Sequence, residues 1–263
     1  MSRVLGVIPA RIGSFRLPRK PLQPLLGKPL VVWVWERARS MDFLDRVVVA
    51  TDSNEVAEAC RQAGAEVLLT SRSHPSGTDR VHEVAARLNA GFDVVLNIQG
   101  DEPLVQAGAL RAAVSMVQDG FEVGTCATPI RSQRELEDPS VVKVVRTLAG
   151  SALYFSRAPI PHRYGPAPEG REPGRDGHLR HVGVYAYEPD ALERWVRFGR
   201  SRLETEEGLE QLRALENGMR IGVAVLEEAA HGVDTPEDLA RLERRLRMGN
   251  VTANTTQGAT ATE

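Results

Sequence analysis

A basic loop near the start of the chain contains the first residues that could do chemistry. Four cations lie within ten residues of one another: Arg11, Arg16, Arg19 and Lys20. No Asp or Glu precedes Glu36. Polyphosphates bind where backbone N–H donors and fixed cations occur together, so this loop predicts a polyphosphate site. It contains neither the Walker A pattern nor the G-x-G-x-x-G dinucleotide turn. The alternative is a solvated surface loop, which is less favoured where a loop follows the first strand of an α/β sheet.

Two carboxylates could supply a metal site. Asp101 follows an apolar strand in the run 97–103, Asn-Ile-Gln-Gly-Asp-Glu-Pro. Asp234 directly precedes Thr235 and Pro236. Magnesium takes one or two protein carboxylates and completes its shell with water and phosphate oxygens, so the pair could hold Mg²⁺ beside a triphosphate. The alternatives are a turn-forming Asp101 and an Asp234 that supports the start of a helix.

A third group of polar residues lies in the second half of the chain. Arg157 follows a strand, and the alternation of residues 180–187 puts His181, Gly183 and Tyr185 on one face. Arginine beside His and Tyr suits an acidic polyol, with Arg on the carboxylate and the others on hydroxyls. Glu210 and Gln211 lie off the Leu stripe of a predicted helix and could reach a sugar. The alternatives are a structural His and a solvated helix face.

Residues 76–80, Ser-Gly-Thr-Asp-Arg, form a further loop-to-helix junction. Gly77 would let a base or a ribose approach the backbone there. An ordinary capped helix is the alternative interpretation of this segment.

Alternating strands and helices must position these groups. Short apolar strands are predicted at 4–8, 46–50, 67–70, 94–98, 124–130, 141–147, 179–187 and 220–226. Helices are predicted at 30–40, 54–63, 79–88, 189–198, 204–216 and 236–247. The first half is typical of a covered parallel sheet, whereas the second half favours mixed or antiparallel pairing. We expect one domain over residues 1–248 and a disordered tail over 249–263.

Composition excludes several classes of protein. The chain has 263 residues, a hydrophobic fraction of 42% and a formal net charge of −2, which gives no general attraction to nucleic acid or membranes. No apolar run is long enough for a membrane span, and no signal segment is evident, so we expect a cytoplasmic protein. Cys60 and Cys126 are unclustered, which argues against a disulfide framework or a zinc site.

These segments together resemble the 3-deoxy-manno-octulosonate (Kdo) cytidylyltransferase family over about residues 3–247. The matching segments are PARIGSFRLPRKPL, ATDS, SGTDR, NIQGDEP, VVKVV, LYFSRAPIP, RHVGVYAY, LEQLRALENG and GVDTPED. The first of these marks a broader group that includes sialate cytidylyltransferases, and the later ones are more specific to the Kdo enzymes. The segment 162–178 departs from the family pattern.

The resemblance implies an α/β nucleotide-diphospho-sugar transferase (Rossmann-like) fold, with a mostly parallel central sheet and a smaller mixed sugar-binding and dimerisation region. It implies transfer of CMP from CTP to Kdo, for lipopolysaccharide biosynthesis, by a homodimer. The residues expected to bind CTP are Arg11, Ser14, Arg16, Lys20, Ser76, Gly77 and Arg80. Those expected to line the Kdo pocket are Gln99, Arg157, His181, Tyr185, Glu210 and Gln211.

The same resemblance gives the catalytic roles. Lys20 and Arg16 would stabilise the charge on the leaving pyrophosphate, while Asp101 and Asp234 would hold Mg²⁺. A cytidylyltransferase for sialate, or for an amino analogue of Kdo, is the alternative. A glycosyltransferase is less favoured because the Asp-x-Asp motif is absent from the sequence, and a non-catalytic binding protein would bind CTP without releasing pyrophosphate.

Overall fold

The computed structural model describes residues 2–13, 17–88, 90–165, 177–229 and 232–248. Within these residues a large mixed sheet has the core order β11-β7-β10-β6-β1-β4-β5, and β8 and β9 extend it from β10. Its strands are β1 (Val4–Pro9), β4 (Arg46–Thr51), β5 (Glu66–Leu69), β6 (Val94–Asn97), β7 (Val123–Pro129), β8 (Lys143–Arg146), β9 (Ala152–Ser156), β10 (Leu179–Tyr187) and β11 (Ile221–Val225). A small hairpin comprises β2 (Pro24–Leu25) and β3 (Lys28–Pro29).

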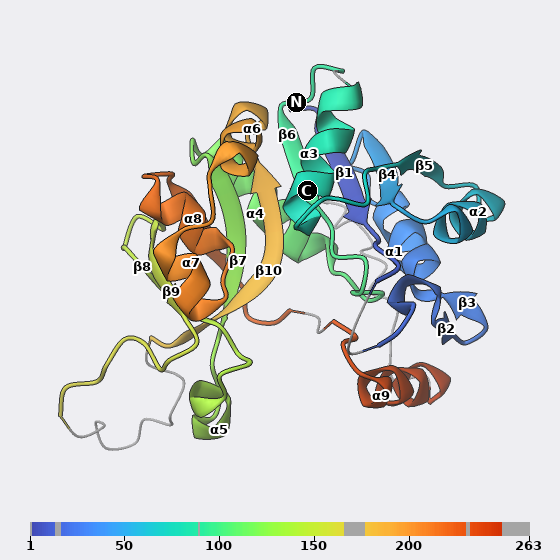
Figure 1. Cartoon of the computed structure of the whole chain (residues 1–263). Coiled ribbons are helices and arrows are strands. Elements are labelled where there is room, and N and C mark those ends of the chain that lie inside the picture. Colours follow the sequence, from blue (N-terminus) through green and yellow to red (C-terminus); the bar gives the residue numbers. More distant parts are fainter. Residues whose placement is uncertain (1, 14–16, 89, 166–176, 230–231, 249–263) are drawn as a thin grey trace, which may run out of the picture.

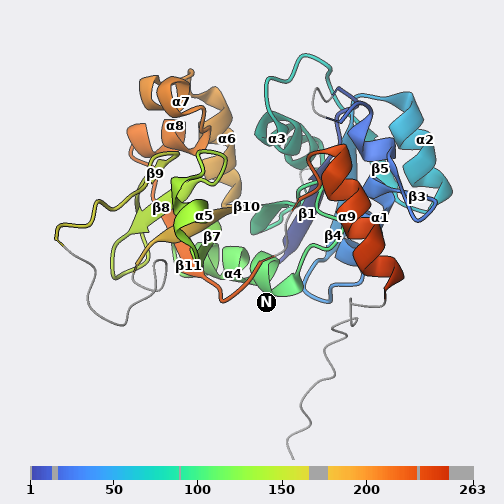
Figure 2. The same ribbon diagram turned by 90° about the horizontal axis from the view of Figure 1, so that it is seen from below.

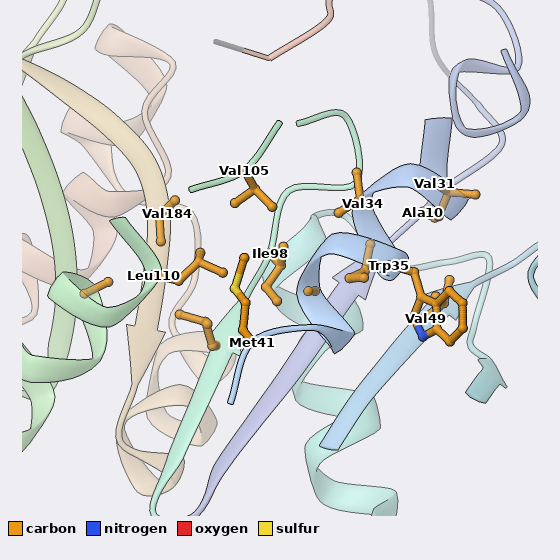
Figure 3. Packing of buried hydrophobic residues seen from close by; sticks show 14 of the residues in the cluster. Ala10, Val31, Val34, Trp35, Met41, Val49, Ile98, Val105, Leu110 and Val184 are labelled. Carbon is orange, nitrogen blue, oxygen red and sulfur yellow. The ribbon is translucent and has the colours of Figure 1, made fainter. Parts of the chain in front are cut away.

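Helices cover both faces of the sheet (Figure 1). They are α1 (Leu30–Arg39), α2 (Asn54–Gln62), α3 (Gly77–Leu88), α4 (Ala107–Gln118), α5 (Gln133–Glu137), α6 (Pro189–Arg197), α7 (Arg202–Glu207), α8 (Gln211–Glu216) and α9 (Pro236–Arg247), with the 3-10 turn η1 (Lys20–Leu22). The side chains of β1 alternate between the two faces. Val4 and Ile8 join the core under α1, α2 and α4, while Leu5 and Val7 join the core under α3, α6 and α8. Figure 3 shows part of the first core, including Trp35, Ile98 and Leu110.

The pairing confirms the predicted change between the two halves. Strands β1, β4, β5 and β6 pair in parallel. Strand β10 is antiparallel to β6 and to β7, and its register shifts between Val182 and Tyr185. Consecutive strands β6 and β7 therefore lie on either side of β10, which arrives much later in the chain.

The last helix returns to the first half of the chain. Leu239, Leu242 and Leu246 of α9 pack against Leu25 and Leu30, so α9 lies across α1 (Figure 2). This return brings the segment before α9 to the loops that follow β1 and β6. Among the described residues, none of the helices is both long and apolar enough to cross a bilayer.

Some details differ from the sequence prediction. Helices α4 and α5 were not predicted. The helix predicted at 204–216 is two helices, because Gly208 adopts φ 63° and ends α7. Ser201 forms a capping box with Glu204 and starts α7 at Arg202. Cys60 and Cys126 are buried free thiols, as predicted. The predicted tail at 249–263 lies outside the described residues.

Candidate active site

A cavity of about 470 Å³ lies at the carboxyl ends of β1 and β6, beside the start of α3. Many of the residues predicted for the site line it: Arg11, Lys20, Ser76, Gly77, Arg80, Gln99, Asp101, Glu210 and Asp234. Ligands of open α/β sheets bind at this position. The volume is within the usual range for a small-molecule site. Ser14 and Arg16 lie outside the described residues.

A glycine brings the two strand ends together. A Cβ atom at Gly100 would lie 2.7 Å from the main-chain oxygen of Pro9, closer than a real Cβ can approach. Only glycine therefore lets the loop after β6 pack on the end of β1. This close approach positions Asp101, the next residue, beside the basic loop.

Lys20 joins the two predicted metal ligands. Its Nζ donates to Oδ1 of Asp234 at 2.8 Å and to Oδ2 of Asp101. The Lys20 side chain is only 13% exposed, whereas the two carboxylates are 32% and 42% exposed. The resemblance predicted Lys20 on a phosphate. In this structure its ammonium lies instead where two carboxylates converge, which is a position that suits a cation.

Asp234 contributes differently through its main chain and its side chain. Helix α9 is capped by Thr235, whose hydroxyl accepts from the Asp238 N–H, while Asp238 accepts from the N–H of Thr235 and of Asp234. The Asp234 carboxylate goes to Lys20 rather than to the helix start. The N–H of Val233 donates to the Asp101 main-chain oxygen at 2.8 Å, which fixes the two segments together.

The donor set suits Mg²⁺. Within the described residues no group of three or more His, Cys, Asp or Glu side chains could hold a metal ion. Two carboxylates with space for water and phosphate oxygens are what Mg²⁺ typically uses. Asp101 and Asp234 fit that pattern, and the ammonium between them shows that the position accepts a positive charge.

Sequence reasoning missed Glu102. Its side chain is buried, and burial together with the Asp101 charge raises the pKa of Glu102 to about 8. The Glu102 carboxyl is therefore mostly neutral at pH 7. Its position directly beside Asp101, after a buried strand, was the available signal.

The residues at the start of α3 divide into two roles. Arg80 is buried, and its guanidinium pairs with Asp52 at 3.3 Å. Asp52 in turn accepts from the Ile12 N–H at 3.3 Å, so Arg80 supports the basic loop through Asp52. Ser76 faces the cavity, and its Oγ lies 3.0 Å from Oε1 of Glu210. Ser76 therefore contacts Glu210, a residue predicted to line the Kdo pocket.

The sugar-side aromatic residues form a cluster next to the cavity rather than in its lining. The His181 and Tyr185 rings are 5.4 Å apart, and His181 Nε2 lies 2.9 Å from the Thr125 hydroxyl. Burial lowers the pKa of His181 to about 3, so its imidazole is neutral. The Gln99 amide donates to the Gly183 main-chain oxygen at 2.8 Å and connects this cluster to the cavity wall. Burial also raises the pKa of Glu210.

Two further predicted residues, Gln211 and Arg157, are also outside the cavity lining. Gln211 is buried, although the sequence placed it off the buried stripe of its helix. Helix α8 is buried on more than its Leu face, because Arg213 and Ala214 are buried as well. The Arg157 guanidinium donates to the main-chain oxygens of Glu207 and Pro139 at 2.7 and 2.9 Å.

Comparisons with known proteins find relatives over nearly the whole chain. A family model described as cytidylyltransferase matches residues 5–221. A 3-deoxy-manno-octulosonate cytidylyltransferase from Pseudomonas fluorescens is 48% identical over 246 residues, which are 91% of this chain and 96% of that protein. One from Syntrophotalea carbinolica is 45% identical over 248 residues, covering 93% and 98% of the two chains. A solved structure of CMP:2-keto-3-deoxy-manno-octonic acid synthetase complexed with CTP is 37% identical. It matches with a TM-score of 0.85 over 94% of this chain and 100% of that chain.

Proposed function

Because this chain belongs to the 3-deoxy-manno-octulosonate cytidylyltransferase family, we propose that it transfers CMP from CTP to Kdo and releases pyrophosphate. The product, CMP-Kdo, would supply the activated sugar for lipopolysaccharide. The observation that carries the proposal is the convergence of Lys20, Asp101 and Asp234 on one cavity that also reaches Glu210.

In the proposed reaction, the anomeric hydroxyl oxygen of Kdo forms a bond to the α-phosphorus of CTP. The bond from that phosphorus to the β-phosphate oxygen breaks, and pyrophosphate leaves with the electron pair. The hydroxyl proton passes to solvent. No covalent enzyme intermediate is required, so catalysis rests on positioning and on stabilising charge.

The residues of the cavity divide these tasks. Lys20 and Arg11 bring positive charge to the triphosphate, as does Arg16 by the family resemblance. Asp101 and Asp234 would hold Mg²⁺, which when bound neutralises phosphate charge and lowers the pKa of a coordinated hydroxyl. Gln99 and Glu210 offer hydrogen bonds to sugar hydroxyls from the lining, and the neutral His181 beside the cavity adds no positive charge to compete for the triphosphate.

The experiment is pyrophosphate release from CTP and Mg²⁺ with Kdo, with sialate or with no sugar. Release that depends on Kdo supports the proposal. Release with sialate instead would assign the chain to the related enzymes, and CTP binding without release would make it a binding protein. Asp101→Ala and Asp234→Ala should each abolish turnover while the thermal unfolding midpoint stays close to that of the unmodified protein. A near-normal rate in either variant would contradict the metal assignment.

We also propose that the protein is a homodimer. In support, Leu148 and Leu153 on the β8–β9 hairpin are 105% and 61% exposed, which is unusual for large apolar side chains. Sedimentation equilibrium measures the oligomeric state directly. Leu153→Glu should shift the protein toward monomer, and a monomeric unmodified protein would refute the proposal.

A further inference from the structure

The carboxylate of Glu207 lies at the end of α7 and reaches the end of β9. Its Oε1 accepts from the Ser156 hydroxyl at 2.6 Å, and its Oε2 accepts from the Arg157 N–H at 2.8 Å. Its main-chain oxygen accepts from Arg157 Nε at 2.7 Å. Glu207 and Arg157 therefore bind each other reciprocally, because the side chain of each bonds to the main chain of the other.

A second side chain, that of Lys143, binds the main-chain carbonyl of Arg157. Lys143 is fully buried, and its Nζ donates to the Arg157 main-chain oxygen at 2.6 Å. It also donates to the main-chain oxygens of Val141 and Asp138 at 2.7 and 3.0 Å. Glu207 thus fixes the N–H of Arg157 while Lys143 fixes its carbonyl.

The Arg157 guanidinium is also hydrogen-bonded, through some of its N–H donors. Of its five N–H donors, three go to described main-chain oxygens, those of Glu207, Pro139 and Gly208. The remaining donors are enough for a carboxylate. A fixed guanidinium loses less rotamer entropy when it binds a ligand than a mobile one does, so this arrangement favours binding of an acid.

The contact also connects the segment that carries Arg157 with the segment that carries Glu210. Glu207 is followed by Gly208, where the chain turns, and then by Glu210, which lines the cavity. Fixing Glu207 on the end of β9 therefore sets the position of Glu210 relative to Arg157. The segments joined are about fifty residues apart in sequence.

We propose that Glu207 is a positioning residue for the sugar acid, which holds Arg157 and Glu210 in the arrangement that binds it. This inference rests on the proposed function, because it takes Kdo as the acid. It assigns Glu207 no contact with substrate. The effect should therefore appear in the KM for Kdo and not in the KM for CTP.

The test compares Glu207→Ala with Glu206→Ala, a control at an exposed position of the same helix. Glu207→Ala should raise the KM for Kdo about tenfold or more, as expected for loss of charged hydrogen bonds, with the KM for CTP within about twofold. Amide hydrogen exchange should rise in a peptide covering residues 152–158. Glu206→Ala should change none of these. Glu207→Gln, whose amide oxygen can still accept from Arg157, should restore much of the Kdo affinity.

Ser156→Ala removes one partner of Glu207 without altering Glu207, so it serves if Glu207→Ala does not fold. It should raise the KM for Kdo severalfold and leave the KM for CTP unchanged. Equal changes in both KM values, or a lower unfolding midpoint with an unchanged KM for Kdo, would overturn the inference. The unmodified protein is assayed first. Failure to release pyrophosphate with Kdo there counts against the proposed function, whereas normal release with an unaffected Glu207→Ala counts only against the positioning role.

Discussion

Replacing Lys20 by Met removes the one ammonium that the structure shows bridging Asp101 and Asp234. A divalent cation that binds these two carboxylates must displace the ammonium or share them with it. Two unit charges 4 Å apart attract by about 1 kcal/mol in water and more in a protein. Both carboxylates are about a third exposed or more, so solvent screening keeps the attraction between the ammonium and the carboxylates to about 1 kcal/mol.

Lys20→Met should therefore bind Mg²⁺ more tightly in the absence of CTP. A change of about 1 kcal/mol corresponds to about fivefold in the dissociation constant. Turnover should move in the opposite direction. Loss of a fixed donor aimed at developing charge typically lowers kcat by about 10²- to 10³-fold. Tighter metal binding combined with slower turnover distinguishes this mechanism from general damage to the site.

Isothermal titration with Mg²⁺ measures the affinity, and pyrophosphate release at saturating substrates measures kcat. Lys28→Met is the matched control, since Lys28 pairs with Glu36 and lies over the Trp33 ring rather than in the cavity lining. It should leave both quantities unchanged. Weaker or unaltered Mg²⁺ binding in Lys20→Met, or a kcat close to normal, would refute the reasoning.

Three further predictions concern stability and pH. Gly124→Ala would place a Cβ atom 2.0 Å from a main-chain oxygen of α4, so we expect the free energy of unfolding to fall by about 3 kcal/mol or more. At Gly108 a Cβ atom would meet no atom within 4 Å, so Gly108→Ala should be neutral or slightly stabilising. Thermal unfolding measures both variants. Arg213→Met leaves the buried Glu204 carboxylate without its bidentate partner. The free energy of unfolding, measured by denaturant titration, should fall by about 3–5 kcal/mol. A decrease of less than about 1 kcal/mol would contradict burial of the pair. Burial lowers the pKa of His181 from 6.5 to about 3, so between these values the unfolded chain binds a proton that the folded chain does not. Stability should fall with decreasing pH in that window by up to about 1.4 kcal/mol per unit, and His181→Gln should reduce this slope in urea titrations at pH 4.5, 5.5 and 7.

Much of the site could be predicted because the chemistry lies at strand ends. The strands before Asp101 and before the basic loop are short and apolar, and parallel pairing brings their carboxyl ends to one edge. The convergence of Asp101 and Asp234 followed from that rule, together with the position of Asp234 before a helix. The structure confirms the juxtaposition, while the Mg²⁺ ion, the homodimer and the cytoplasmic location stay predictions.

Other features depend on tertiary contacts that no local pattern reveals. The reciprocal contact between Glu207 and Arg157 joins residues far apart in sequence, and neither residue type signals its partner. Arg80 lines the cavity, but nothing in the sequence indicated that its guanidinium also pairs with Asp52, which accepts from the basic loop. The break in the predicted helix at Gly208 was overlooked because the Leu stripe used for the prediction lies entirely after Gly208.

The placement of β10 between β6 and β7 has a consequence for how the chain is made. The ribosome synthesises β6 and β7 long before β10, so neither strand can pair along the edge that β10 later occupies until residue 187 has emerged. Strand β11, which pairs with β7, comes later still. Unpaired strand edges invite association with other chains. The nascent polypeptide therefore passes through a period of exposure in which shielding by a chaperone, or slow translation of the second half, would alter the yield of folded protein.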